Sequence, residues 1–143
     1  SGAWAWTALL MMSLWGVGPA VVIYLAGLRD VPKQLHEAAS LDGVGSWGRF
    51  VHVTLPMISP VILFNVVIGI INAAQVFVIP LVMTGGGPGR STYFFAMYVY
   101  DQAFQYGDMG YASVLGLVQF AAILVLTGLV LLLGQRFVYY RGA

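Results

Sequence analysis

Side chains that can take part in charge or acid–base chemistry are concentrated in one interval, residues 29–56. This interval holds six of the eleven charged residues of the chain and both histidines. Glu37 stands at its centre and is followed by Ala38 and Ala39. Because these two alanines carry little bulk, another protein surface can approach the carboxylate closely. On these residue types alone two interpretations stay open: a surface for a partner protein, or a solvated loop that joins two spans.

Catalytic and metal chemistry have little support in the sequence. No Asp, Glu, His, Lys or Cys lies inside the long apolar runs, so a hydrolytic or transferase site at membrane depth lacks its acids and bases. His36 and His52 are far apart in the sequence, with no cysteine near them. We expect no catalytic residue and no metal site. A membrane-embedded enzyme, or its anchor subunit, stays the alternative function, whereas an ion channel would need a charged ring or a carbonyl filter.

The chain contains three long apolar runs, and two of them border this interval. The 143-residue chain is 60% hydrophobic and only 8% charged. Its charge-free runs cover residues 1–28, 50–89 and 109–135, and each exceeds the roughly 20 residues that a bilayer-crossing helix needs. We predict an all-α polytopic membrane protein with transmembrane spans at about 4–28, 57–83 and 109–134. The net charge of +1 argues against nucleic acid as a partner.

The positions of Lys and Arg predict the orientation of the spans. Five of the six lie in the loop 29–56 or after the last span, and only Arg90 lies in the loop 84–108. The excess of positive charge on cytoplasmic loops places the loop 29–56 and the C-terminus in the cytoplasm. The chain begins inside an apolar run without an initiator Met. We therefore interpret it as the C-terminal portion of a longer protein.

Local signals predict two short helices in the loop 29–56. Pro32 suits the first position of a helix, and residues 33–41 have an amphipathic pattern. Gly43 can adopt the left-handed conformation that ends such a helix. Ser46 can cap a second helix over about 47–53. On the other side of the membrane, the Tyr- and Phe-rich residues 93–106 predict an interfacial helix within the external segment 84–108.

Amides and small residues inside the spans suggest a route for a solute. Asn65, Gly69, Asn72 and Gln75 fall within an arc of roughly 100° on a helix of 3.6 residues per turn. Amides in hydrocarbon seldom face lipid, and they either bond between helices or line a wet cavity. Both interpretations stay open. For the second, we expect the path to be lined by Gly16, Gly69, Asn72, Ala73 and Val76.

The spacing in the loop resembles the E-A-A-x-x-x-G-x9-I-x-L-P loop of bacterial binding-protein-dependent ABC importers. The identities stand at the family spacing, with Val53 where Ile is usual. In that family the loop is where the membrane subunit docks onto its cytoplasmic ATPase. The resemblance implies ATPase coupling by Glu37, Ala38, Ala39, Asp42, Gly43, Leu55 and Pro56.

A second resemblance lies in the external segment and the start of the last span. Gly86-Gly87-Pro88, Ala103-Phe104 and Gly110–Ser113 occur in the order found in sugar-importer permeases of the maltose and glycerol-phosphate type. The resemblance implies a permease subunit of the bacterial inner membrane that carries a carbohydrate or related polyol. The implied partners are cytoplasmic ATPase subunits, a second permease subunit, an external solute-binding protein and the lipid bilayer. No G-x-x-x-x-G-K-[ST] motif occurs, so ATP and Mg are expected on the partner ATPase.

Overall fold

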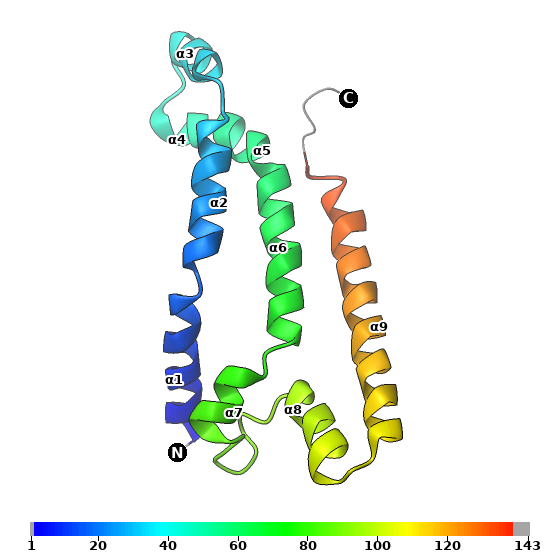
Figure 1. The fold of residues 1–143 in the computed structure, drawn as a ribbon. Helices are drawn as coiled ribbons and strands as arrows, with labels where there is room; N and C mark the ends of the chain where they lie inside the picture. Colours follow the sequence, from blue (N-terminus) through cyan, green and yellow to red (C-terminus); the bar gives the residue numbers. More distant parts are fainter. Residues whose placement is uncertain (1, 139–143) are drawn as a thin grey trace. The chain divides into compact units, whose positions relative to one another are not determined.

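The computed structural model describes residues 2–138, and within this range every regular element is a helix. Figure 1 shows their order along the chain. The all-α fold class is therefore confirmed. The elements are α1 (Gly2–Trp15), α2 (Gly18–Arg29), α3 (Lys33–Leu41), α4 (Ser46–Arg49), the π-helix η1 (Phe50–Thr54), α5 (Leu55–Met57), α6 (Ser59–Ala74), α7 (Val78–Thr84), α8 (Phe95–Tyr100), the π-helix η2 (Asp101–Gln105) and α9 (Met109–Gly134).

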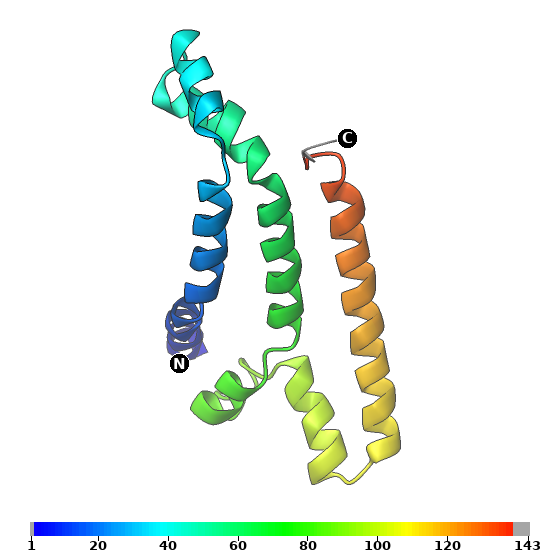
Figure 2. The same ribbon diagram turned by 45° about the horizontal axis from the view of Figure 1, so that its top comes forward.

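Helix length and composition agree with a polytopic membrane protein. In the described part of the chain, only α9 is by itself long and apolar enough to cross a membrane, with a mean hydropathy of 2.5. Figures 1 and 2 show it as one unbroken rod. Two further pairs, α1 with α2 and Ser46–Met57 with α6, meet the same criteria when each bent pair is counted as one span. The cytoplasmic C-terminus predicted from the sequence lies beyond the described residues.

The chain folds as two compact units. Unit 1 contains residues 1–16 and 69–128, and therefore α1, the end of α6, α7, α8, η2 and most of α9. Unit 2 contains residues 17–68 and 129–143, and therefore α2 to α5, most of α6 and the end of α9. The loop that the sequence associates with ATPase coupling lies in unit 2. The residues that it associates with a solute path lie in unit 1.

Prolines account for the irregular backbone in unit 2. Pro56 has no N–H to donate to the carbonyl four residues earlier. The chain there forms the π-helix η1, with Leu55 N–H donating to Phe50 O. A bend of 65° follows between Ser46–Met57 and α6. Pro60 likewise has no N–H for Pro56 O, and the Ser59 hydroxyl donates to that oxygen at 2.6 Å instead.

A break in unit 1 divides the segment that the sequence predicted as one span over 57–83. Residues 75–77 are not helical, and they separate α6 from α7. Pro80 gives the physical reason, because it cannot donate to Val76 O and its ring disfavours a helix through the preceding turn. It is tolerated in the first turn of a new helix, which is where α7 places it. A similar break at residues 16–17 precedes Pro19, at the start of α2.

Candidate functional site

The centre of the loop 29–56 is the C-terminal turn of α3. Ala38 O accepts the N–H of Asp42 at 3.1 Å, and Ala39 O accepts the N–H of Val44 at 3.0 Å. Gly43 has a φ of 75°, which a glycine adopts without strain. The turn thus satisfies the carbonyls of both alanines and directs the chain away from the helix axis. Glu37 and Asp42 are exposed beside it.

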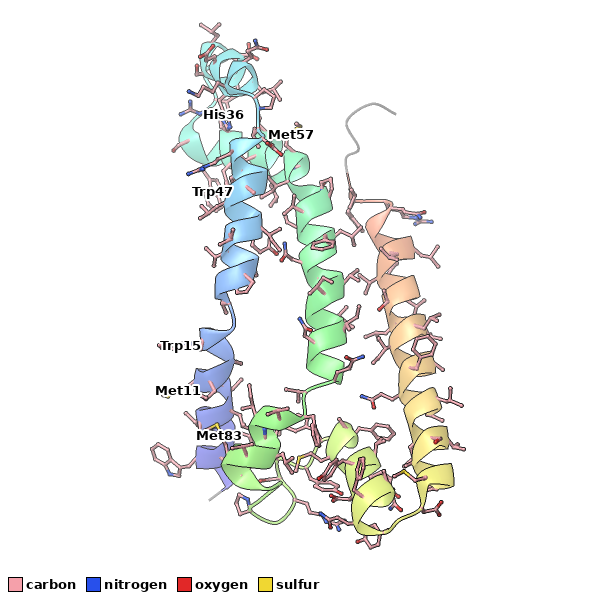
Figure 3. All side chains as sticks on the ribbon, in the orientation of Figure 1. Met11, Trp15, His36, Trp47, Met57 and Met83 are labelled. Atoms are coloured by element: carbon pink, nitrogen blue, oxygen red, sulfur yellow. The ribbon has the colours of Figure 1, made fainter. Side chains whose placement is uncertain are left out.

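The second half of the loop carries aromatic rings on a short, irregular helix. Gly45 precedes α4 and no side chain caps it, so the prediction that Ser46 is the cap is wrong. The rings of Trp47 and Phe50 stack with centroids 5.7 Å apart. Trp47 is 76% exposed and Leu41 is 89% exposed. Figure 3 labels Trp47 on α4 and His36 on α3. The loop therefore presents apolar surface next to its carboxylates.

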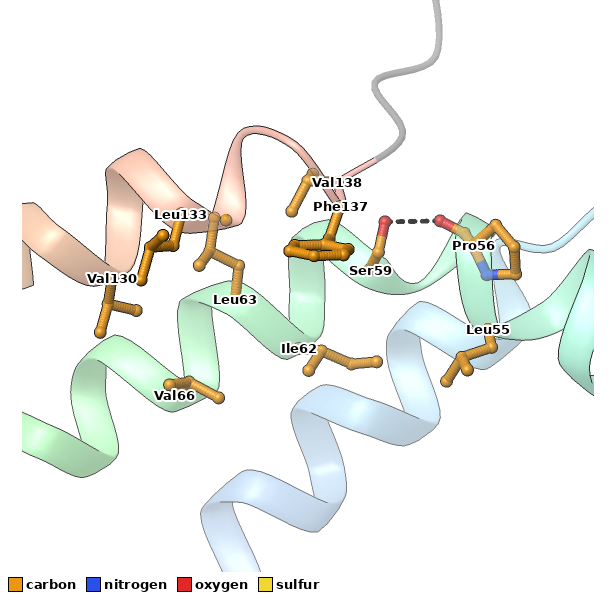
Figure 4. A pocket seen from close by; sticks show the side chains of 11 residues that line it. Leu55, Pro56, Ser59, Ile62, Leu63, Val66, Val130, Leu133, Phe137 and Val138 are labelled. Carbon is orange, nitrogen blue, oxygen red and sulfur yellow. Dashed lines mark hydrogen bonds between the residues drawn. The ribbon is translucent and has the colours of Figure 1, made fainter.

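Leu55 and Pro56 lie apart from the Glu37 turn, at the other end of the loop. They line an apolar cavity of about 460 Å³ together with side chains of α6 and with Val130, Leu133, Gly134, Phe137 and Val138. Figure 4 shows the Phe137 ring within this lining, between Leu63 and Ser59. Pro56 also lines a second cavity of about 320 Å³, which includes Leu35 of α3. Pro56 thus connects the short helices of the loop to the start of α6.

The structure brings together only part of the predicted solute path. Ala73 and Val76 line a cavity of about 280 Å³ in unit 1, with Trp6, Leu9, Leu10, Ser13, Ile79, Pro80 and Phe94. Apart from the Trp6 indole, its only polar side chain is that of Ser13. Asn72 and Gly69 are exposed at the end of α6 and are not among these lining residues. Gly16 does not join them either, since a Cβ there would have Ser13 O as its nearest neighbour, at 3.4 Å.

A polar site next to the predicted path was missed by the sequence analysis. Gln119 of α9 donates from Nε2 to Ala74 O at 2.8 Å. Gln119 and Gln75 line a cavity of about 210 Å³ with Ala96, Gly116, Phe120 and Ile123. Two signals were available in the sequence: Pro80, which interrupts the helix before it, and Gln119, the amide in the middle of an apolar span. The pairing itself joins residues 45 apart and has no local signature.

The turn over residues 84–92 in unit 1 is held by two threonines. Thr92, only 1% exposed, lies with its hydroxyl 2.7 Å from that of Thr84 and 2.8 Å from Gly87 O. The Thr84 hydroxyl lies 2.8 Å from Pro80 O. Each hydroxyl carries one hydrogen, so two of these three contacts are hydrogen bonds at any moment. These hydroxyl contacts therefore hold the turn in a defined conformation.

Tyr93 joins the end of this turn to η2. Its hydroxyl donates to the Asp101 carboxylate, and the Arg90 guanidinium lies over its ring at 5.2 Å from the centroid. Burial raises the pKa of Tyr93 to about 12, and the hydrogen bond and negative charge of Asp101 add to the rise. The phenol therefore stays protonated, and a donor, at physiological pH. These contacts link the turn to the aromatic segment 95–105.

Comparison with known proteins places this geometry in context. The model of a family described as binding-protein-dependent transport system inner membrane component matches residues 1–139. The chain is similar to the sulfoquinovosyl glycerol transport system permease protein of Agrobacterium fabrum, with 40% identity over 90% of this chain and 42% of the relative. It is also similar to the trehalose/maltose transport system permease protein of Thermococcus litoralis, with 33% identity over 92% of this chain and 44% of the relative. The lactose transport system permease protein of Rhizobium radiobacter is 35% identical to the chain, over 87% of this chain and 43% of the relative. The chain spans less than half the length of these curated relatives.

Proposed function

Since the chain belongs to the family of binding-protein-dependent transport system inner membrane components, we propose that it is part of the permease of an ATP-driven sugar importer. In this proposal unit 1 contributes to the translocation path and unit 2 carries the loop that couples it to a cytoplasmic ATPase. ATP and Mg bind the ATPase partner. A second permease subunit and an external solute-binding protein complete the assembly. The C-terminus lies in the cytoplasm.

The geometry of α3 is the observation that carries the coupling role. Its last turn exposes Glu37 next to two alanines, and Gly43 ends it in the left-handed conformation. A short helix with small side chains can enter a shallow groove of a partner, where the carboxylate pairs with a basic group. A hydrogen bond to a charged group contributes about 1.5–3 kcal/mol. The exposed Leu41 and Trp47 supply apolar area that a partner would bury.

The proposed solute class is a saccharide or a related polyol. The three relatives described above have sulfoquinovosyl glycerol, trehalose/maltose and lactose in their names. Amides such as that of Asn72 both donate and accept hydrogen bonds, as hydroxyl-rich solutes require. The alternative of a membrane-embedded enzyme has no support among these relatives, which are named as transport permeases.

Coupling is tested in the full-length permease assembled with its ATPase in proteoliposomes. The measurement is the stimulation of ATP hydrolysis by solute-loaded binding protein. Glu37→Ala should lower this stimulation about tenfold, because it removes a charge-assisted contact. Gly43→Trp should abolish it, because a bulky residue is strained at a φ of 75°. Both variants should insert into the membrane normally, since the loop lies outside the bilayer.

Gln34→Ala is the matched control for these variants. Gln34 is exposed on α3 but lies outside the residues assigned to coupling. Its substitution should leave the stimulation unchanged. Full stimulation in both the Glu37 and the Gly43 variants, with assembly intact, would remove the docking role from this loop.

A further inference from the structure

The break between α6 and α7 leaves backbone carbonyls without helical partners in an apolar segment. α6 ends at Ala74, and Gln75 N–H still donates to Ile71 O at 3.2 Å. Within the described range, no backbone N–H reaches the carbonyls of residues 72–74. The segment lies in the charge-free run 50–89. Carbonyls at membrane depth are tolerated only where protein or a wet cavity supplies donors.

One of these carbonyls receives its donor from another helix. The Gln119 amide of α9 bonds to Ala74 O, and both residues belong to unit 1. Gln119 is half-buried, and the two residues that flank it, Val118 and Phe120, are apolar. The bond therefore fastens the open end of α6 to an unbroken helix. Pro80 keeps that end open, because it offers no N–H to Val76 O.

The last turn of α6, which Gln119 holds, lies between two cavities with different linings. On one side, Gln75 and Gln119 line the cavity of about 210 Å³. On the other, Ala73 and Val76 line the apolar cavity of about 280 Å³ that also includes Trp6 and Ser13. A rotation of the turn would exchange amide for apolar side chains in both cavities. Holding the turn in one orientation thus decides which side chains line each cavity.

We propose that Gln119 is a positioning residue for the solute path. Its amide holds the end of α6 so that Asn72, in the last turn of that helix, presents its carboxamide and its free carbonyl in one geometry. Hydroxyl groups of a saccharide would then meet fixed donors and acceptors. This inference rests on the proposed function, and it adds a residue that does not itself contact the solute.

The first test needs no solute. Hydrogen–deuterium exchange is measured by mass spectrometry on the full-length permease, assembled with its ATPase in nanodiscs. Gln119→Leu removes the donor, and exchange of the amides at 72–75, which donate within the last turn of α6, should become about tenfold faster as that turn opens more often. Gln75→Leu is the matched control: it lines the same cavity but does not contact Ala74 O, and it should exchange like the wild type.

Gln119→Glu keeps the size of the side chain and makes the bond depend on protonation. The ionised carboxylate has no donor, whereas the protonated acid can donate to Ala74 O. We therefore compare amide exchange in the Gln119→Glu variant with that in the wild type at the same pH. Exchange in the variant should be faster at high pH, and the difference should shrink as the pH falls. Wild-type exchange in both Gln119 variants at every pH would overturn the proposal.

The second test separates positioning from a purely structural role. Uptake of radiolabelled maltose, trehalose, lactose and sulfoquinovosyl glycerol is measured in proteoliposomes. For whichever of these the wild type carries, Gln119→Leu should raise KM about tenfold and leave kcat within about twofold. Faster exchange with an unchanged KM would overturn the positioning role. Uptake of none of the four by the wild type would count against the proposed function, while the exchange data would still decide whether Gln119 holds α6.

Discussion

At the scale of single residues, the amides of this chain have different environments despite their common chemistry. Asn65 donates to Val61 O within its own helix at 3.0 Å, so part of its hydrogen-bonding capacity is used locally. Gln119 donates to another helix. Asn72 is exposed at the end of α6. Of these three, Asn72 is therefore the one best suited to exchange partners with a passing solute.

Asn72→Leu tests this assignment because it removes the amide and nearly preserves the volume of the side chain. The loss of one hydrogen bond to an uncharged hydroxyl should weaken solute interaction by about 1 kcal/mol, several-fold in affinity. Uptake of labelled solute per assembled complex is the measurement. Gly69→Phe should reduce uptake more severely, because it fills open space: a Cβ at this position would meet no atom of another segment within 4 Å.

A loss of assembly in place of a loss of uptake would contradict the assignment of Asn72 to the solute path. If Asn72→Leu lowers the amount of assembled complex but spares uptake per complex, the amide bonds between helices and the solute passes elsewhere.

At the scale of elements, the sequence predicted regular helices well and their breaks less well. The amphipathic pattern of residues 33–41 and the glycine at 43 correctly predicted α3 and its end. The run 57–83 was interpreted as one span because hydrophobicity alone does not reveal where a helix stops. Pro80 marked the break, but the bond between Gln119 and Ala74 depends on tertiary packing. No pattern in a single sequence specifies such a pair.

The contact between α4 and the linker that joins it to α3 makes a prediction at this scale. A Cβ at Gly48 would lie 2.6 Å from Val44 Cγ1. Gly48→Ala should therefore force Val44 from its rotamer or push α4 away, at a cost of about 1 kcal/mol. Amide exchange over residues 43–50 should become about fivefold faster. Val44→Ala in the same chain removes the clashing methyl and should restore slow exchange.

Gly45→Ala is the control for this pair. Gly45 has a φ of −65° and no atom within 4 Å of a Cβ, so it should exchange like the wild type. Equal acceleration in both alanine variants would mean that loss of glycine, and not the Val44 contact, loosens the loop.

At the scale of the whole molecule, basic residues and exposed apolar side chains occupy different parts of the chain. The loop 29–56 carries Arg29, Lys33 and Arg49, whereas the segment 84–108 carries one basic residue. The helices between them expose long apolar side chains on most of their surface, as α9 does with Leu117, Leu124 and Leu132. This distribution suits a protein that lipid and neighbouring helices surround. The same distribution underlies the proposed orientation.

Single cysteines test that orientation in intact cells, in a full-length permease from which any cysteine outside this chain has been removed; the chain itself has none. Ser40→Cys should resist an impermeant thiol reagent and should react only after the cells are opened. Gln105→Cys should react in intact cells, and its side chain is exposed in η2. Ser91 is a poorer choice on that side, because its hydroxyl is buried. The reverse pattern of labelling would invert the orientation and remove the loop from the ATPase.

The unbroken course of α9 also limits how the length of the chain can vary. Gln119 meets Ala74 O near its middle, and Gly134 at its end lies so close to Leu63 that a Cβ would approach within 2.6 Å. One residue inserted between these two points would rotate one contact by about 100° around the helix axis relative to the other. An insertion at 75–77, where the backbone is not helical, imposes no such rotation. Length changes should therefore accumulate at the breaks and be absent from α9.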